Sequence, residues 1–411
     1  MKKIIIIGGG PAGMMAAIQA AKNDSNVILL EKTNRVGKKL SITGKGRCNI
    51  TNAADIQEII KNIPDNGRFL NSVLRAFDSN DVINFFESIG VKTKIERGNR
   101  VFPQSDKAVE VVDTLINQMT KLGVEIRTNT RVTDIISSSN KIIGVEIGKN
   151  IESADAVILA VGGSSYPATG STGDGFEMAK KLGHTVTKIL PALVPLETEE
   201  TFVKDLQGLS LRNVKVTLFA DNKKIAEEFG EMLFTHFGVS GPIILTLSRQ
   251  AAMLLDEGKF VELSINLKPA LTPEQLSARV IRDFEKFQRK SARNALVELL
   301  PHALIPIILD LAYIDEEKHI DSVTQAERKR LIETLRDFRL TIKKTRPISE
   351  AIVTSGGVSV KEINPKTMES KLIKNLFFAG EVVDIAGFTG GFNLQAAFSM
   401  GYAAGKFSRN Y

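Results

Sequence analysis

A short glycine-rich turn near the start of the chain has the spacing of a phosphate-binding loop. The segment Gly8-Gly9-Gly10-Pro11-Ala12-Gly13 fits G-x-G-x-x-G and lies between a β-branched run and an Ala- and Met-rich stretch. The first glycine permits the tight turn, the second lets a pyrophosphate approach the backbone, and the third lets strand and helix pack closely. The N-terminus of the helix favours the anion. The predicted contacts are Gly8, Gly10, Pro11, Ala12 and Gly13.

An acidic residue follows at the distance at which dinucleotide-binding folds hold a ribose. Glu31 closes a second buried strand, predicted at 26–30, about 20 residues after the glycines. Its carboxylate is well placed to accept hydrogen bonds from the hydroxyls of an adenosine ribose. We include the adjacent Lys32 in the same predicted site. The turn and the acid together predict a site for NAD or FAD.

A second nucleotide signal lies far along the chain and favours FAD over NAD. The strand-like run 375–379 leads into Gly380-Glu381, which resembles a late flavoprotein motif whose acid contacts the ribitol chain of FAD. The acid here is Glu rather than Asp, so the carboxylate is kept on a longer arm. Gly391-Phe392-Asn393 then begins a closing helix whose N-terminus could face the flavin pyrimidine ring. Two widely separated nucleotide signals fit FAD better than NAD.

Two internal segments extend the predicted cofactor site. The buried strand predicted at 155–160 ends in Gly162-Gly163 and resembles a further FAD-type element, so Ala160 and Gly162 join the site. The stretch 41–52 combines small residues, two cations and several hydrogen-bonding side chains, which suits a loop folded over a phosphate or the flavin. Its candidate contacts are Gly46, Arg47 and Cys48. The alternatives are a solvated connector and, for Cys48, a buried and inert thiol.

The elements that position these residues indicate an interrupted nucleotide-binding domain in an α/β fold. Buried strands are predicted near both ends of the chain, whereas the middle changes to antiparallel β structure and then to helices that begin at capping boxes. We predict an FAD-binding domain at 1–190 and 346–411. An inserted β-rich domain is predicted at 191–272 and about 341–345, and a small helical domain at 273–340.

Composition narrows the function further. Only one of the 411 residues is a cysteine, so a dithiol reductase is excluded. The apolar run at 4–7 is too short for a signal peptide, and no run approaches the roughly 20 residues needed to span a bilayer. We expect a cytoplasmic protein that does not bind a membrane. Because the chain has no Trp and only a mild net charge of +7, we expect no nucleic-acid partner.

Long motifs spread over nearly the whole chain resemble those of the BaiN/YhiN-like family of bacterial flavoproteins. The matching stretches are GKGRCNITN at 44–52, SYPATGSTGDG at 165–175, GEMLFTHFGVSGP at 230–242, TSGGV at 354–358 and GEVVDIAGFTGGFNLQAAFSMG at 380–401. The resemblance implies a Rossmann-like FAD domain, with a mostly parallel sheet and an antiparallel crossover, interrupted by a β-barrel-like domain and a small helical domain. It also implies an NAD(P)/FAD-dependent oxidoreductase or an aminoacetone-oxidase-like enzyme.

Carried over by motif, the resemblance implies flavin contacts by Ala12, Glu31, Arg47, Glu381 and Asn393. It also suggests that the backbone of Val132 meets the adenine. We expect no metal site, since no metal-ligand spacing is present.

His236 is the candidate acid or base that faces the substrate, because an imidazole titrates near neutrality. A structural role beside Phe234 and Phe237 is the alternative.

The expected activity is hydride transfer between a small organic substrate and flavin. NAD(P)H could be the reductant, binding transiently because no second G-x-G-x-x-G is present. Oxidation of an amine or aminoketone with O2 is an alternative, and an FAD-dependent RNA-modifying or RNA-binding protein is a more remote one. The sequence fits hydride transfer in either direction, as reduction or as oxidation of the substrate. It also fits more than one oligomeric state.

Overall fold

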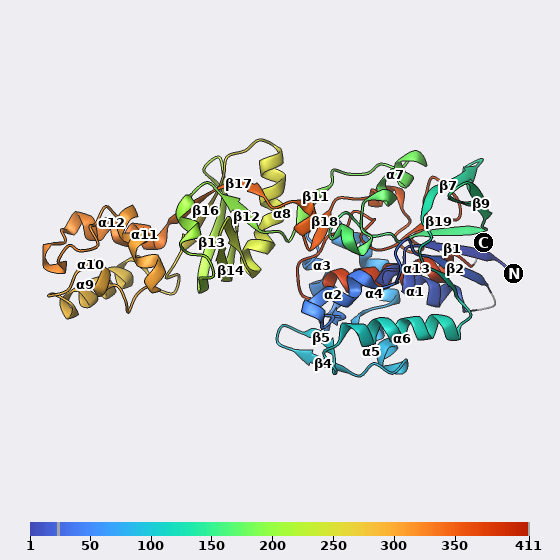
Figure 1. Ribbon diagram of the computed structural model, residues 1–411, viewed down its shortest axis with the longest axis horizontal. Coiled ribbons are helices and arrows are strands. Elements are labelled where there is room, and N and C mark those ends of the chain that lie inside the picture. The colour runs from blue at the N-terminus through green and yellow to red at the C-terminus, as the bar shows by residue number, and fades with distance from the viewer. Residues whose placement is uncertain (23–24, 410–411) are drawn as a thin grey trace. The chain divides into compact units, whose positions relative to one another are not determined.

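The computed structural model describes residues 1–22 and 25–409, and the chain divides into two compact units (Figure 1). Unit 1 comprises Met1–Leu190 and Ile348–Tyr411, and unit 2 comprises Pro191–Pro347. The barrel and the helices of unit 2 share one hydrophobic core, so the division into three domains expected from the sequence remains a proposal. Among the described residues, no helix is long and apolar enough to cross a membrane.

A five-stranded parallel sheet forms the centre of unit 1 and confirms the predicted Rossmann-like fold. Its strand order is β19-β10-β1-β2-β6. The strands are β1 (Lys3–Ile7), β2 (Asn26–Leu30), β6 (Glu125–Arg127), β10 (Ala156–Leu159) and β19 (Leu376–Phe378). Four of them, β1, β2, β10 and β19, are nearly continuous apolar runs, as expected for strands covered on both faces, whereas the edge strand β6 reads Glu-Ile-Arg. Because β19 pairs with β10 in parallel, the C-terminal segment completes a sheet that the N-terminal segment begins.

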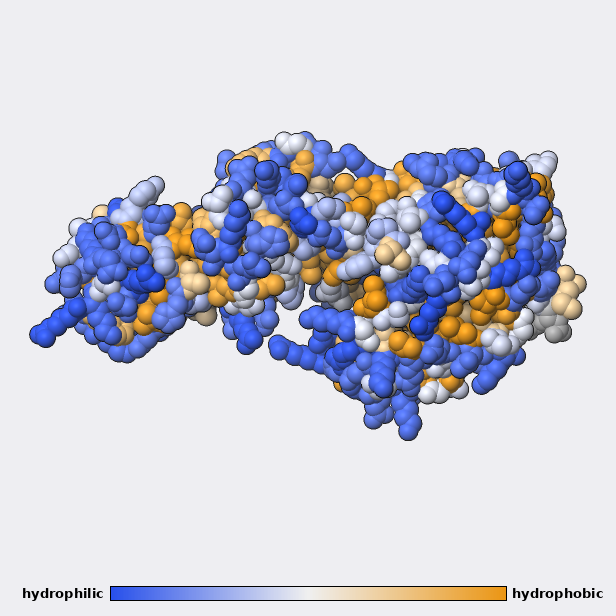
Figure 2. Space-filling model, in the orientation of Figure 1, coloured by the Kyte–Doolittle hydropathy of each residue, from blue (hydrophilic) through white to orange (hydrophobic). Residues whose placement is uncertain are grey.

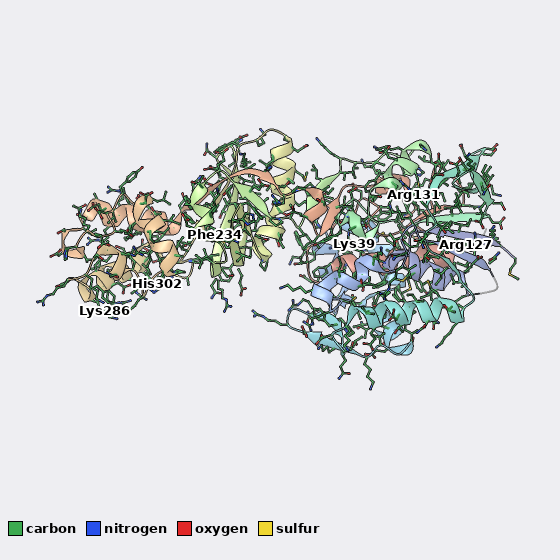
Figure 3. The ribbon with its side chains drawn as sticks, in the orientation of Figure 1. Lys39, Arg127, Arg131, Phe234, Lys286 and His302 are labelled. Atoms are coloured by element: carbon green, nitrogen blue, oxygen red, sulfur yellow. The ribbon has the colours of Figure 1, made fainter. Side chains whose placement is uncertain are left out.

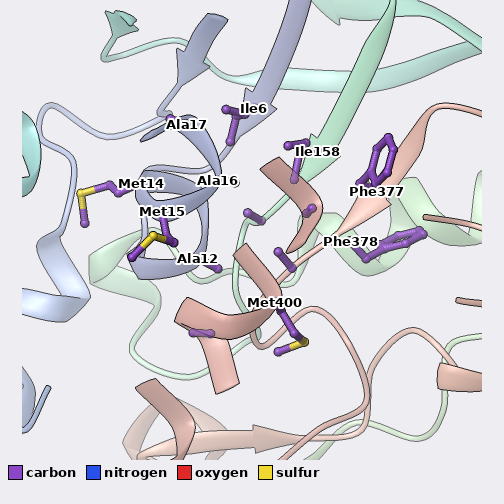
Figure 4. Close-up of a cluster of buried hydrophobic side chains, with 14 of the residues drawn as sticks. Ile6, Ala12, Met14, Met15, Ala16, Ala17, Ile158, Phe377, Phe378 and Met400 are labelled. Carbon is purple, nitrogen blue, oxygen red and sulfur yellow. The ribbon is translucent and has the colours of Figure 1, made fainter. Parts of the chain in front are cut away.

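Two helices from opposite ends of the chain pack together on this sheet. Helix α1 (Pro11–Ala20) follows β1, and α13 (Phe392–Phe407) is the last helix of the chain. Figure 4 shows Met14, Met15 and Met400 in the buried cluster beside strand residues such as Ile6 and Phe378. Burial of a methionine side chain contributes about 1.5–3 kcal/mol, so this cluster stabilises unit 1.

The remaining elements of unit 1 form two small antiparallel sheets and a set of surrounding helices. One sheet, β3-β5-β4, contains β3 (Thr51–Asn52), β4 (Thr93–Glu96) and β5 (Arg100–Pro103). The other, β7-β8-β9, contains β7 (Val132–Ser138), β8 (Lys141–Ile147) and β9 (Asn150–Ser153). The helices are α2 (Lys38–Gly46), α3 (Ile56–Lys61), α4 (Asn71–Ala76), α5 (Ser79–Ser88), α6 (Ala108–Lys121) and α7 (Asp174–Lys181). The short strand β18 (Val353–Ser355) completes the set, and β11 (Leu190–Ala192) lies at the chain boundary between unit 1 and unit 2.

Unit 2 contains a closed antiparallel barrel, which confirms the β-barrel-like insertion. The strand order is β12-β15-β14-β13-β16-β17. The strands are β12 (Leu196–Thr198), β13 (Ser210–Ala220), β14 (Lys223–Thr235), β15 (Gly238–Ser240), β16 (Val261–Asn266) and β17 (Phe338–Thr345). Alternate residues point inward, and the rings of Phe234 and Phe338 are fully buried in the core. Closure removes the exposed strand edges that an open sheet would present.

The helices of unit 2 are α8 (Pro242–Asp256), α9 (Pro273–Lys286), α10 (Ala292–Ala295), α11 (Ile305–Leu311) and α12 (Gln325–Arg336). Two of them, α9 and α12, begin where capping boxes predict. Thr272 and Thr324 each accept a hydrogen bond from the backbone N–H three residues later, and the side chains of Gln275 and Glu327 complete the two capping boxes. On the side shown in Figure 2, the surface of the helical segment at the left is mostly hydrophilic, with some hydrophobic side chains between the polar ones.

Candidate functional site

The glycine turn after β1 has the geometry that a bound pyrophosphate requires. Gly8 has a φ of +103°, and a Cβ atom on it would lie 2.5 Å from the carbonyl oxygen of Ala160. A Cβ on Gly13 would overlap the carbonyl oxygen of Gly8, whereas a Cβ on Gly10 would meet nothing within 4 Å. The first and third glycines are therefore needed for packing. The second leaves open space at the N-terminus of α1, where an anion would be stabilised.

Glu31 is fixed at the end of β2 by the backbone around it. Its Oε2 accepts the N–H of Gly9 at 2.9 Å, and its Oε1 accepts the N–H of Thr33 at 2.8 Å. The N–H of Thr130 donates to the Glu31 carbonyl at 2.9 Å, which brings the start of β7, with buried Val132, beside this acid. The structure thus brings together the glycine turn, from which a pyrophosphate contact was predicted, and the two segments from which contacts with the ribose and the adenine were predicted.

A loop at 164–173 lies over the same acid and is tied down by Lys32. A Cβ on Gly170 would lie 3.6 Å from Glu31 Oε1. The Nζ of Lys32 lies 2.8 Å from a carboxylate oxygen of Asp174, at the start of α7, and Arg131 also pairs with this carboxylate at 3.3 Å. Burial raises the pKa of Asp174, but the hydrogen bonds from Lys32 and Thr172 outweigh it, and the net shift is downward. The ammonium of Lys32 therefore anchors the loop.

The late glycine motif meets the early one directly. A Cβ on Gly380, whose φ is +80°, would lie 2.9 Å from the methyl group of Ala12. The following residue, Glu381, accepts the backbone N–H of Thr354 at 2.6 Å. Its carboxylate also pairs with Lys39 at 2.8 Å and lies 3.1 Å from Ser165 Oγ. The predicted ribitol contact is thus held beside the N-terminal turn of α1.

The N-terminus of α13 is built by close backbone contacts. Gly391, the N-cap, has a φ of +102°, and a Cβ there would overlap the backbone of Thr51. Asn393 does not point its amide into open space: its Oδ1 accepts the N–H of Gly387 at 2.8 Å, and its Nδ2 donates to the carbonyls of Gly387 and Phe388. Phe392 is buried. Asn393 therefore shapes the loop before α13 by holding its backbone.

The stretch expected to be a loop at 41–52 begins as a helix. Helix α2 continues to Gly46, with a break in its backbone conformation at residues 43–45. The Arg47 guanidinium pairs with Glu96 and Asp106 and lies 4.1 Å above the centre of the Phe102 ring. These carboxylates raise the pKa of Arg47. Arg47, which the sequence predicted as a flavin contact, therefore forms ion pairs with two carboxylates of the protein in this structure.

Cys48 follows this cluster and is fully buried. Burial raises the pKa of its thiol to about 12, so the group is neutral at physiological pH. This environment fits the inert thiol that the sequence left as an alternative.

Comparison with known proteins identifies the family. The HI0933-like protein Rossmann domain family matches residues 2–407. The chain belongs to this family. This result confirms the resemblance found in the motifs, and the HI0933-like chain is an FAD-dependent oxidoreductase.

Two curated relatives align with nearly the whole HI0933-like chain. A 3-dehydro-bile acid delta(4,6)-reductase of Clostridium scindens is 34% identical over 408 residues, which cover 99% of this chain and 98% of the relative. A ribosomal RNA dihydrouridine synthase of Escherichia coli is 30% identical over 403 residues, covering 97% and 96%. The solved 3-ketosteroid delta1-dehydrogenase of Sterolibacterium denitrificans covers 99% of each chain with a TM-score of 0.55 and 11% identity, and this likeness concerns the fold alone.

The residues of unit 1 fit FAD by their chemistry. Two helices present glycine N-caps, Gly10 and Gly391, which leave the first N–H groups of each helix without a side-chain cap. Gly10 has room for a ligand, and Glu31 offers carboxylate oxygens to ribose hydroxyls. No cluster of His, Cys, Asp and Glu suited to a metal is present among residues 1–22 and 25–409.

The HI0933-like chain places His236 in unit 2, whereas the predicted FAD contacts all belong to unit 1. His236 is exposed in the turn between β14 and β15, and its ring stands edge-on to Phe237 with a centroid distance of 4.9 Å.

Sequence reasoning did not select Lys39, Ser165 or Thr354 as site residues. Each reaches Glu381 from a distant segment, so no local spacing connects them with it. Ser165 and Thr354 do belong to the family motifs at 165–175 and 354–358, and this membership could have pointed to them.

Proposed function

We propose that this FAD-dependent oxidoreductase reduces a carbon–carbon double bond that is conjugated with a carbonyl group. The observation that supports the proposal is the shared chemistry in the names of its two full-length relatives. A Δ4,6 double bond beside a 3-oxo group is conjugated with that carbonyl, and dihydrouridine is uridine with its conjugated ring double bond saturated. Two otherwise different substrates thus have the same reacting group.

Saturation of such a bond requires a hydride on the carbon farther from the carbonyl and a proton on the adjacent carbon. FAD, when bound, would supply the hydride. The chain would orient the cofactor through Glu31 and the glycine turn, and polar groups at the carbonyl oxygen would stabilise the charge that develops there. His236 is the proposed proton donor, because an imidazole can deliver a proton near neutral pH. The proposed substrate is a small molecule, and NAD(P)H is the proposed source of electrons.

The test is an anaerobic experiment in two steps. The flavin of the purified protein is first reduced with NADH, NADPH or, as a control, dithionite, and the loss of its visible band is recorded. A 3-oxo-Δ4 steroid or cyclohexenone is then added without O2. Return of the visible band with formation of the saturated ketone is the expected result. Reduction of the flavin by an aminoketone, reversed only by O2, would replace this proposal with the oxidase alternative.

A second candidate substrate is uridine within RNA. The full-length Escherichia coli relative supports it by name. The helical segment 273–340 gives it no support, because it has as many Asp and Glu as Lys and Arg residues. Unit 2 as a whole is balanced in the same way, so the net positive charge of the chain belongs to unit 1. The charge balance therefore favours unit 1 as the part that would bind an RNA substrate, with an affinity that falls steeply as salt rises.

A direct comparison separates the two substrates. The reduced protein is mixed with protein-free ribosomal RNA or with the steroid, and dihydrouridine is measured by mass spectrometry. Dihydrouridine in the RNA, with no turnover of the free enone, would establish the RNA function. Turnover of the enone alone would leave a small-molecule reductase.

A further inference from the structure

Lys39 lies between the two glycine motifs of unit 1 (labelled in Figure 3). Gly37, the N-cap of α2 and two residues before Lys39, donates its N–H to the carbonyl oxygen of Gly9 at 2.8 Å. At its other end, the Lys39 side chain places Nζ 2.8 Å from Glu381 Oε2. Glu381 directly follows Gly380, which packs on Ala12. Lys39 therefore connects the early phosphate-binding turn with the late acidic motif.

In the described part of the chain, the ammonium of Lys39 has two hydrogen-bond partners for its three donors. Its Nζ lies 2.6 Å from Ser165 Oγ and 2.8 Å from Glu381 Oε2. An ammonium group has three N–H donors, so one is left for a further acceptor. The side chain is 21% exposed, which means that the group is partly desolvated yet can be reached by a ligand.

The charges around the site make a cation at this position useful. Glu31 and Glu381 place one carboxylate at each motif, and a bound FAD would add the negative charges of its pyrophosphate. Lys39 offsets the Glu381 carboxylate, whose Oε1 already accepts the N–H of Thr354. In a partly buried site such a pair is screened less by salt than a pair on the open surface. Without the cation, Glu381 would repel the phosphates that the turn has to bind.

We infer that Lys39 is a cofactor-binding residue: its free N–H donates to the pyrophosphate–ribitol part of FAD while its charge neutralises Glu381. The inference rests on the FAD site described above. It differs from a purely structural role in one respect, because Lys39 then contributes to FAD affinity beyond its contribution to folding of the protein without cofactor.

The experiment compares Lys39→Met and Lys39→Arg with Lys38→Met. Lys38 is the matched control, since it lies next to Lys39 on α2 and makes no ion pair in the described part of the chain. FAD is removed from each protein, FAD affinity is measured by titration at several salt concentrations, and the melting temperature of the cofactor-free protein is recorded. Lys39→Gln replaces Lys39→Met if the methionine variant does not fold.

The inference predicts FAD binding that is at least about tenfold weaker in Lys39→Met than in wild type, with a smaller dependence on salt. Lys39→Arg should retain most of the affinity, and Lys38→Met should behave as wild type. The inference is wrong if Lys39→Met binds FAD as tightly as wild type. It is also wrong if the variant binds FAD more weakly but with the wild-type salt dependence, and the loss of affinity only parallels a lower melting temperature of the cofactor-free protein. If wild type itself does not bind FAD, the proposed function fails instead.

Discussion

Gly401 of α13 lies directly against the carbonyl oxygen of Ala12 in α1, with no room for a side chain between them. Gly405, one turn later, stands in the same way against Ala16. The two glycines let the last helix approach the first one backbone to backbone. This contact sets the position of the N-terminus of α1, where the pyrophosphate is expected, from the far end of the chain.

Gly401→Ala should therefore destabilise unit 1. The added methyl group would overlap a backbone oxygen, and overpacking of this kind costs about 1–3 kcal/mol. Urea unfolding followed by circular dichroism measures the loss, and Lys406→Ala on the exposed face of α13 is the control. A Gly401→Ala protein with wild-type stability would mean that the helices separate at little cost.

Glu31→Ala should weaken FAD binding by at least about tenfold, because hydrogen bonds to a charged group contribute about 1.5–3 kcal/mol each. The carboxylate also holds Gly9 and Thr33, so the shape of the phosphate-binding turn should suffer as well. Titration of the cofactor-free protein with FAD measures the effect. Glu177→Ala, at an exposed position of α7, should bind FAD normally. Equal affinity in the two variants would contradict the assignment of Glu31 to the ribose.

Local patterns in the sequence were sufficient for much of the fold. The apolar runs of β1, β2 and β10 indicate a parallel sheet because each is buried on both faces, and Thr272 and Thr324 start helices through contacts within one turn. The start of α2 was missed because Gly44 and Gly46 make the segment 41–52 look like a loop. The backbone of α2 is non-helical at residues 43–45, so the glycines indicated only this irregular part of the helix and not its regular start.

The polar contacts of the site depend on tertiary structure and were out of reach. Lys39 and Glu381 are 342 positions apart, and only the pairing of β19 with β10 places the late motif beside the early one. Arg47 and Asn393 illustrate the converse. Their residue types suited flavin contacts, but carboxylates from another segment engage Arg47, and the loop before α13 engages Asn393. A sequence motif thus indicates which residues lie near the site, whereas the direction of each side chain depends on the other segments that pack against it.

Asp174→Asn should speed the release of FAD. The Asp174 carboxylate holds Lys32 and Arg131 and thereby fixes the loop 164–173 over Glu31. Loss of one charge should loosen the loop, so we expect FAD to be released several-fold faster. The release rate is measured from the recovery of flavin fluorescence after dilution. Asp134→Asn removes a similar but more exposed pair with Lys181 and serves as the control. Unchanged release in Asp174→Asn would show that the loop does not retain the cofactor.

Cys48 should not react with a thiol reagent in the folded protein. Its pKa of about 12 lies above the ordinary value of 9.0 for a cysteine thiol, so between these pH values the unfolded thiol ionises while the folded one stays protonated. The folded state is therefore fully favoured by this group below pH 9.0 and loses that advantage as the pH rises toward about 12. Ellman's reagent at pH 8 should label one thiol only after denaturant is added. Rapid labelling of the native protein would place Cys48 at an accessible site.

His236→Ala tests the proposed proton donor. The residue belongs to unit 2, outside the segments that form the FAD site, so the variant should retain FAD at the wild-type level. If His236 protonates the substrate, reoxidation of the reduced flavin by an enone should slow by about 100-fold or more. Phe237→Leu is the control, because it removes the ring beside His236 and keeps the imidazole. Wild-type reoxidation kinetics in His236→Ala would remove His236 from the mechanism and leave solvent or another side chain as the proton source.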